Sequence, residues 1–216
     1  MGIEAVIWDF GGVFTTSPFD RFATFETERG LPKDFIRTIN ATNPDANAWA
    51  RFERSEISLD EFDEAFLAEA AAAGHEVRGK EIVALLSGTV RPEMVRALDR
   101  ILAHGIRCAC ITNNVRAGQG PGISADEETA AAVADVMSRF ELIVESSKVG
   151  VRKPDPKIYQ HALGELGVAA EAAVYLDDLG VNLKPARQLG MQTIKVAGPE
   201  QALGELEAIV GIDLRA

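Results

Sequence analysis

Short apolar runs alternate along the chain with segments of helical periodicity. The runs are typical of buried strands and cover residues 4–10, 106–112, 141–146, 172–178 and 192–198. Between them, apolar positions recur at the spacing of an amphipathic helix, most clearly over residues 157–167 and 182–190. This alternation favours an α/β fold built on a parallel, doubly wound sheet.

Residues at the ends of two of these segments support the helical interpretation. Asp155 precedes Pro156, an N-cap followed by the proline that tolerates the first helical position, and Gly167 lies where that helix should end. In the second segment we expect Asn182 to cap the helix and Gly190 to stop it.

Residues 16–90 interrupt the alternation, because they contain helical patterns and no convincing strand. Ser58 followed by Glu61 is a capping-box pattern that predicts the start of one of these helices. We therefore predict a helical insert over residues 16–90 and an α/β core from residues 1–15 and 91–216. Residues 115–125, with three glycines and a proline, predict an exposed loop.

Composition and charge narrow the classes of function. Of the 216 residues, 47% are hydrophobic and 25% are charged, as in globular proteins generally. The formal net charge of −11 repels nucleic acid, so we predict no nucleic-acid partner. No apolar run reaches the roughly 18 residues of a membrane span, so we predict no membrane partner either.

The cysteines and the first residues indicate the compartment. Cys108 and Cys110 alternate along a predicted strand and are expected to be small buried hydrophobes on one face. The opening MGIEAVIWDF has no basic region, which argues against a secretory signal. Without a disulfide framework, a cytoplasmic location is the prediction.

Polar residues follow the predicted strands at the edge where parallel strands end and ligands bind. These residues are an acid, a hydroxyl beside an amide, an amine and a pair of acids: Asp9, Thr112 with Asn113, Lys153, and Asp177 with Asp178. Each is common at a turn or surface by itself. Their arrival in order at successive strand ends is what phosphoryl transfer onto a carboxylate requires.

The residue types assign roles within this chemistry. Asp9 is the candidate nucleophile, and Thr112 with the backbone after it would bind phosphoryl oxygens. Lys153 would offset the charge shared by nucleophile and phosphate. Asp178 would bind Mg²⁺, a cation that prefers oxygen ligands.

Four motifs resemble those of the haloacid dehalogenase-like (HAD) hydrolase superfamily: AVIWDFGGVF, ITNN, ESSKVGVRKPDPKIY and VYLDDLGVNLKPARQLGM. The later motifs and the C-terminal segment are especially similar to the phosphatase domain of soluble epoxide hydrolases and to the HAD domain of some acyl-CoA dehydrogenase fusions. The resemblance implies a Rossmann-like core with strand order 5-4-1-2-3. It also implies that the insert over residues 16–90 is a helical cap.

The resemblance also implies site residues. Asp9, Thr112, Asn113 and Lys153 match the catalytic positions. Asp9, Asp178 and the backbone carbonyl of Gly11 match the Mg²⁺ ligands. The implied outer contacts of the ion are Asp177, through water, and Asn182. A small phosphorylated substrate follows, whereas the oligomeric state is open.

Gly11 departs from the family pattern, because most family phosphatases carry a second aspartate there. That aspartate protonates the leaving group and then activates water, which is worth about 10²–10⁴-fold in rate. An alternative to a phosphatase is therefore a low-activity or non-catalytic HAD domain. A third hypothesis is a haloacid dehalogenase, which needs no metal. We favour the phosphatase over the dehalogenase because Asp177 and Asp178 beside Asp9 would repel unless a cation lay between them.

Two residues of the helical insert are candidate substrate contacts. Trp49 could form a wall of the site and Arg51 could bind a phosphate or carboxylate. The competing interpretation is that Trp49 belongs to the core of the insert, which is what we predict for its phenylalanines.

Overall fold

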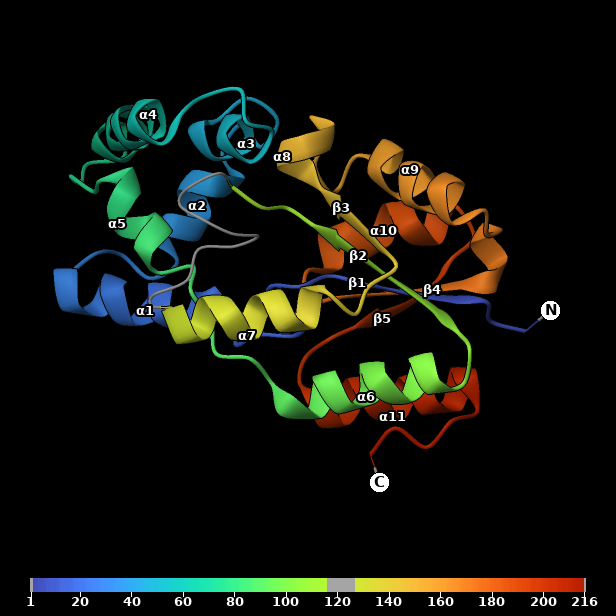
Figure 1. Ribbon diagram of the computed structural model, residues 1–216. Coiled ribbons are helices and arrows are strands. Elements are labelled where there is room, and N and C mark those ends of the chain that lie inside the picture. The colour runs from blue at the N-terminus through green and yellow to red at the C-terminus, as the bar shows by residue number, and fades with distance from the viewer. Residues whose placement is uncertain (1, 116–126, 216) are drawn as a thin grey trace.

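In a computed structural model, which describes residues 2–115 and 127–215, the chain forms an α/β fold around a parallel sheet. The described strands are β1 (Ala5–Trp8), β2 (Arg107–Thr112), β3 (Leu142–Glu145), β4 (Ala173–Asp177) and β5 (Gln192–Lys195). They pair in the order β3-β2-β1-β4-β5 (Figure 1). This is the predicted order read from the other edge, so the predicted fold is confirmed.

The central strand β1 is covered on both faces. Val6 and Trp8 face one apolar cluster, and Ala5 and Ile7 face the other. Continuous apolar runs are required in such a sheet because helices cover both faces. The first cluster also contains the two cysteines, so their predicted burial on one face is confirmed. Burial raises the pKa of the Cys108 thiol to about 12.

Helices pack on both sides of the sheet (Figure 1). On one face lie α6 (Pro92–Ala103), α7 (Glu127–Met137) and α11 (Pro199–Val210), whose buried residues join the cluster of Trp8. The other face is covered by α9 (Pro156–Leu166) and α10 (Gly180–Gln188). The short α8 (Ser146–Val149) follows β3, and a 3₁₀ turn over Ala170–Ala172 precedes β4.

The predicted ends of α9 are confirmed. Asp155 accepts a hydrogen bond from Lys157 N at 2.9 Å, Pro156 is the first helical residue, and Gly167 ends the helix at φ 63°. The N-cap of α10 was predicted wrongly. This helix begins at Gly180, two residues before Asn182.

The amide of Asn182 has a tertiary role in place of capping. Its Nδ2 donates to both carboxylate oxygens of Asp177, at 3.0 Å each. The local sequence shows a residue type that caps helices well, but the buried carboxylate next to it in space decides where its side chain points.

A separate group of helices follows β1 in sequence and lies near the end of the sheet where the strands finish (Figure 1). They are α1 (Pro18–Arg29), α2 (Phe35–Ala41), α3 (Ala48–Glu53), α4 (Leu59–Ala72) and α5 (Gly79–Ala84). Their apolar residues form a cluster of their own, which includes Phe52, Phe62 and Phe66. The Ser58–Glu61 capping box at the start of α4 is present, as predicted.

The chain leaves and re-enters the sheet layer at one place. Thr15 and Val90 form an antiparallel bridge, and Thr16 N donates to Thr89 O at 2.9 Å. The two connections to the helical group therefore lie side by side.

None of the helices in the described ranges is both long and apolar enough to cross a bilayer. The loop predicted over residues 115–125 lies, from residue 116 onward, outside the described residues.

Candidate active site

Three carboxylates meet where β1 and β4 end. Asp9 follows β1 and still donates its backbone N–H to Leu176 O across the sheet at 2.8 Å. Asp177 ends β4 and Asp178 follows it. Each of the three acids offers an oxygen, and these oxygens all lie within 4.8 Å of one another. The parallel pairing of neighbouring strands is what brings these distant stretches together.

Lys153 is the cation among these acids. Its Nζ lies 2.7 Å from Asp9 Oδ1 and 2.9 Å from Asp177 Oδ2, and its side chain is only 1% exposed. A buried ammonium in this position bridges two acids from different strands. One positive charge among three carboxyl groups leaves an excess of negative charge when all three are ionised.

This excess of negative charge, together with burial, shifts the pKa values of the acids. Burial, followed by repulsion from Asp177, raises the pKa of Asp178 to about 6. Burial also raises the pKa of Asp9 well above its usual range, although Lys153 opposes the shift. Burial lowers the pKa of Lys153, but the attraction of Asp177 and Asp9 outweighs it, so the net shift is upward.

This donor set suits a hard divalent cation, which binds carboxylate and carbonyl oxygens and would relieve the repulsion between the acids. The fit rests on the convergence of Asp9, Asp177 and Asp178. Asp177 is already engaged, because Lys153, Asn182 and the Leu179 backbone N–H all contact its oxygens. Asp9 has fewer contacts than Asp177, because within the described residues its carboxylate only accepts from Phe10 N at 2.6 Å and pairs with Lys153. Asp9 and Asp178 are therefore the carboxyl groups more open to a cation.

Two tyrosines that sequence reasoning missed support Asp177. The hydroxyl of Tyr175 donates to Asp177 Oδ2. Tyr159 donates to the backbone oxygen of Asn182 at 2.7 Å and packs edge-on against Tyr175 with ring centroids 5.3 Å apart. No sequence signal marks them, because tyrosine within an apolar run is typical of an ordinary core residue.

Thr112 and Asn113 end the neighbouring strand β2. Thr112 is the last strand residue and is buried, as expected of a group at the carboxyl edge. The side chain of Asn113 contacts the backbone of Lys153 twice, accepting from its N–H at 2.8 Å and donating to its carbonyl at 3.0 Å. Asn113 therefore orders the segment that bears the lysine.

Gly11 and Gly12, which follow Asp9 and Phe10, differ in whether there is space for a side chain. A Cβ on Gly11 would meet no atom within 4 Å, whereas one on Gly12 would lie 2.3 Å from Asp178 Oδ2. Gly12 also has φ +76°, a conformation that L residues rarely adopt. The close approach of Gly12 to Asp178 is therefore a requirement of the site, while Gly11 is sterically free.

Replacing Gly12 by alanine is expected to displace the Asp178 carboxylate and to lower the free energy of unfolding by about 1–2 kcal/mol or more, the cost of a left-handed conformation for an L residue. Gly164→Ala is the control, because Gly164 lies in α9 with open space around it. The control should be neutral or slightly stabilising. Urea denaturation of both variants measures the difference, and equal stabilities would contradict this role of Gly12.

The predicted substrate contacts lie in α3. Trp49 is half-buried, packs edge-on against Phe62 with centroids 5.6 Å apart, and donates from Nε1 to Glu53 Oε1 at 2.9 Å. Arg51 is exposed. Trp49 thus packs against the apolar cluster of α1–α5 while remaining partly exposed.

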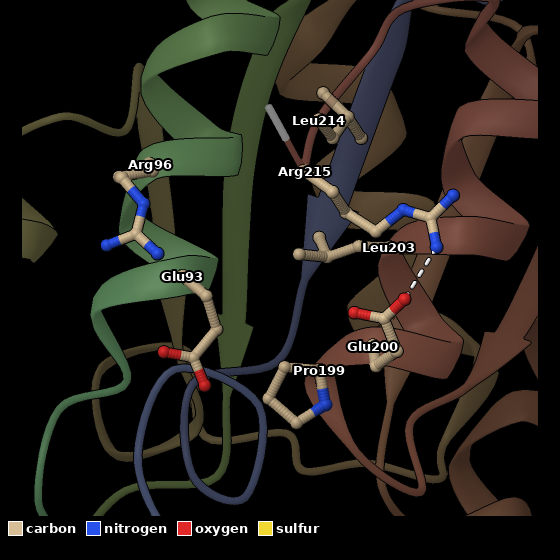
Figure 2. A pocket seen from close by; sticks show the side chains of 7 residues that line it. All are labelled: Glu93, Arg96, Pro199, Glu200, Leu203, Leu214 and Arg215. Carbon is tan, nitrogen blue, oxygen red and sulfur yellow. Dashed lines mark hydrogen bonds and ion pairs between the residues drawn. The ribbon is translucent and has the colours of Figure 1, made fainter.

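A surface cavity of about 330 Å³ lies elsewhere, between α6 and α11. Figure 2 shows its lining, in which the Arg215 guanidinium is paired with Glu200 at 2.7 Å. None of the strand-end residues lines this cavity. The exposed Arg215 and Glu200 pair with each other there, and the lining lacks the buried, converging charges of the carboxylate site.

The chain combines a parallel α/β sheet with an acid after its first strand, a buried lysine beside that acid and further acids at the end of β4, as expected for a hydrolase of the family that its motifs resemble. Residues 3–190 match the family model described as haloacid dehalogenase-like hydrolase. The chain belongs to this family.

Curated relatives agree with this assignment. The chain is 35% identical to acyl-CoA dehydrogenase family member 10 of Mus musculus over 98% of its length, which is 19% of that relative. It is 29% identical to bifunctional epoxide hydrolase 2 of Sus scrofa, with 99% of this chain and 40% of the relative covered. The chain thus spans less than half of these two relatives. A sesquiterpene phosphatase of Aspergillus oryzae is 26% identical, with 96% and 97% covered.

Solved structures share the fold. A HAD family enzyme of Bacteroides thetaiotaomicron, in complex with magnesium and inorganic phosphate, has a TM-score of 0.57 at 18% identity and covers 90% of this chain and 94% of its own. The L-2-haloacid dehalogenase of Xanthobacter autotrophicus has a TM-score of 0.58 at 18% identity, with 95% and 82% covered. The fold is therefore shared with a HAD family enzyme that binds magnesium and inorganic phosphate and with a haloacid dehalogenase.

Proposed function

We propose that the protein is a Mg²⁺-dependent phosphomonoester hydrolase that acts through a phosphoryl group on Asp9. The observation that carries this proposal is the Lys153 ammonium between the Asp9 and Asp177 carboxylates, with an oxygen of Asp178 close by. Such a site binds a phosphoryl dianion beside an anionic nucleophile only if positive charge is fixed there in advance.

The proposed reaction has two steps. An oxygen of Asp9 attacks phosphorus, the bond from phosphorus to the ester oxygen breaks, and the leaving alkoxide takes a proton from water. A water molecule then attacks the phosphoryl group, which releases inorganic phosphate and restores the Asp9 carboxylate. Lys153 stabilises the charge on the transferring oxygens in both steps, and the Thr112 hydroxyl with the backbone after it binds them.

We propose Asp9, Asp178 and the Gly11 carbonyl as the Mg²⁺ ligands, with Asp177 and Asn182 outside them. When bound, Mg²⁺ would supply positive charge that neutralises phosphoryl oxygens. We propose Asp177 chiefly as the anionic partner of Lys153, which Asn182 holds in place.

We propose that residues 16–90 form a cap over the site and that the substrate is a small phosphorylated molecule. The separate apolar cluster of α1–α5 and the paired connections at Thr15 and Val90 support this division. Arg51, exposed on α3, is the proposed contact for an anionic part of the substrate, with Trp49 beside it. The cytoplasmic location stays a prediction.

Gly11 supports a second candidate function, a HAD domain with low or no turnover. An exposed glycine supplies no proton donor at the position where most family phosphatases have an acid. Dehalogenation is the third hypothesis, and release of halide from a haloacid without metal would revive it.

The first test is hydrolysis of p-nitrophenyl phosphate with and without Mg²⁺. Chelation with EDTA is expected to abolish activity, because the phosphoryl dianion would otherwise enter a site with an excess of carboxylates. Restoring Mg²⁺ should restore the rate, and Ca²⁺, which favours more ligands and longer bonds, should support much less of it. Full activity after exhaustive chelation would refute the metal dependence.

A further inference from the structure

Glu53, the last residue of α3, connects the helical group to the segment that bears Lys153. Its side chain is buried and has contacts from three parts of the chain. Trp49 Nε1 donates to Oε1 at 2.9 Å, Arg152 Nε lies 2.6 Å from Oε2, and Asn113 Nδ2 donates to Oε2 at 3.3 Å. Two of these partners lie outside the helical group, because Asn113 follows β2 and Arg152 lies between α8 and α9.

Arg152 and Asn113 both lie next to Lys153, one in sequence and the other in space. Arg152 immediately precedes it in sequence, and Asn113 bonds to its backbone N–H and carbonyl. The Asn113 amide thus uses its oxygen on Lys153 and directs its nitrogen to both Lys153 and Glu53, which leaves its orientation little freedom. A displacement of the Glu53 carboxylate would release one of these constraints.

Two further bonds tie α3 and the loop before it to the α/β core. The hydroxyl of Ser146, in α8, donates to the backbone oxygen of Glu53 at 2.8 Å. Arg152 donates from Nη1 to Pro44 O at 2.8 Å, so its guanidinium spans from the Glu53 carboxylate to the loop before α3. Figure 1 shows α3 and α8 as neighbours.

Charge favours the same interpretation. A buried carboxylate is costly without a partner, and Arg152 provides one in a direct ion pair. The pair adds no net charge next to the strand-end carboxylates. Because the pair of Glu53 and Arg152 is neutral overall, an acid can lie near the proposed phosphate-binding site without repelling the substrate.

We infer that Glu53 is a positioning residue. Through Arg152 and Asn113 it holds the backbone around Lys153, so that the ammonium stays between the two carboxylates that it bridges. The kinetic part of this inference rests on the proposed phosphatase function, whereas the coupling of α3 to the Lys153 segment does not.

The test is Glu53→Gln, which keeps the shape of the side chain and removes its charge. We expect kcat for p-nitrophenyl phosphate at saturating Mg²⁺ to fall about 10- to 100-fold, with a small change in KM, because small misplacement of a catalytic group is costly. Amide hydrogen exchange over residues 146–153 should become faster, while that of β5 stays unchanged. Glu56→Gln is the control, since Glu56 pairs with Arg54 at the surface.

Arg152→Gln tests the pair from the other side and remains informative if Glu53→Gln folds poorly. We expect a similar loss of kcat and no further loss in the double variant, because both substitutions break one network. Additive losses, or a loss confined to KM, would overturn the inference. Unchanged exchange over residues 146–153 would also overturn it. If the wild-type chain hydrolyses no phosphomonoester, the proposed function fails, and the exchange measurement alone decides the coupling.

Discussion

Asp9→Asn is expected to reduce Mg²⁺-dependent hydrolysis of p-nitrophenyl phosphate by about 10⁴-fold or more, the scale of loss when a covalent nucleophile is removed. An amide is nearly isosteric with the carboxylate but cannot attack phosphorus to form an acyl phosphate. Lys153 keeps Asp177 as its partner, so the lysine remains in place. The rate under saturating Mg²⁺ and the thermal midpoint should both be measured.

A matched control separates loss of chemistry from loss of structure. Asp99 pairs with Arg139 at the surface, with Arg139 Nε 2.9 Å from Asp99 Oδ1, so Asp99→Asn removes an equal charge far from the strand ends. It should retain wild-type activity. Rapid acid quenching with a labelled substrate should trap phosphate on the wild type and not on Asp9→Asn. Substantial activity in Asp9→Asn would rule out the proposed nucleophile.

Gly11→Asp is expected to raise kcat about 10²-fold, because it supplies the proton donor that most family phosphatases have at this position. The structure leaves room for the new side chain, since a Cβ at Gly11 meets no atom within 4 Å and its φ lies outside the left-handed region. The effect should be largest for esters with poor leaving groups, which depend most on protonation. Steady-state rates for an alkyl and an aryl phosphate measure it.

Gly11→Asn is the control for this gain, because asparagine has the same shape and transfers no proton at neutral pH. A gain for aspartate alone identifies the chemistry as acid–base. A large gain from an undetectable wild-type rate would favour the hypothesis of lost turnover, and a robust wild-type rate would reject it. Equal rates for both variants would contradict the acid–base explanation.

Much of the fold was predictable because it follows from local patterns. Buried parallel strands have continuous apolar runs, and helix starts have capping residues such as Asp155 and Ser58. The candidate site was also predictable in outline, since a parallel sheet gathers the residues at its strand ends. Asp9 and the two adjacent acids needed no more than this rule to be singled out, whereas Lys153 lies beyond α8 and away from the end of β3.

The supporting residues were not predictable in this way. Glu53 lies in a helical segment whose pattern is amphipathic, and nothing there distinguishes it from a surface acid. Tyr175 has the pattern of a core residue, and only its hydroxyl bond to Asp177 shows otherwise. Capping preference predicts Asn182 as a helix cap, whereas its amide contacts the Asp177 carboxylate five residues earlier, a contact that this preference does not include.

The sequence by itself determined the order of strands and helices, the acid, hydroxyl and amine at the strand ends, and the missing acid at Gly11. Only the tertiary structure decided which side chains contact these acids, because it pairs Asp177 with Lys153 and Asn182 and brings Asp178 close to Asp9. The physical reason is the distance along the chain over which each effect acts. Periodicity and capping depend on backbone geometry within a few residues, whereas burial and charge pairing depend on which distant side chains packing brings together.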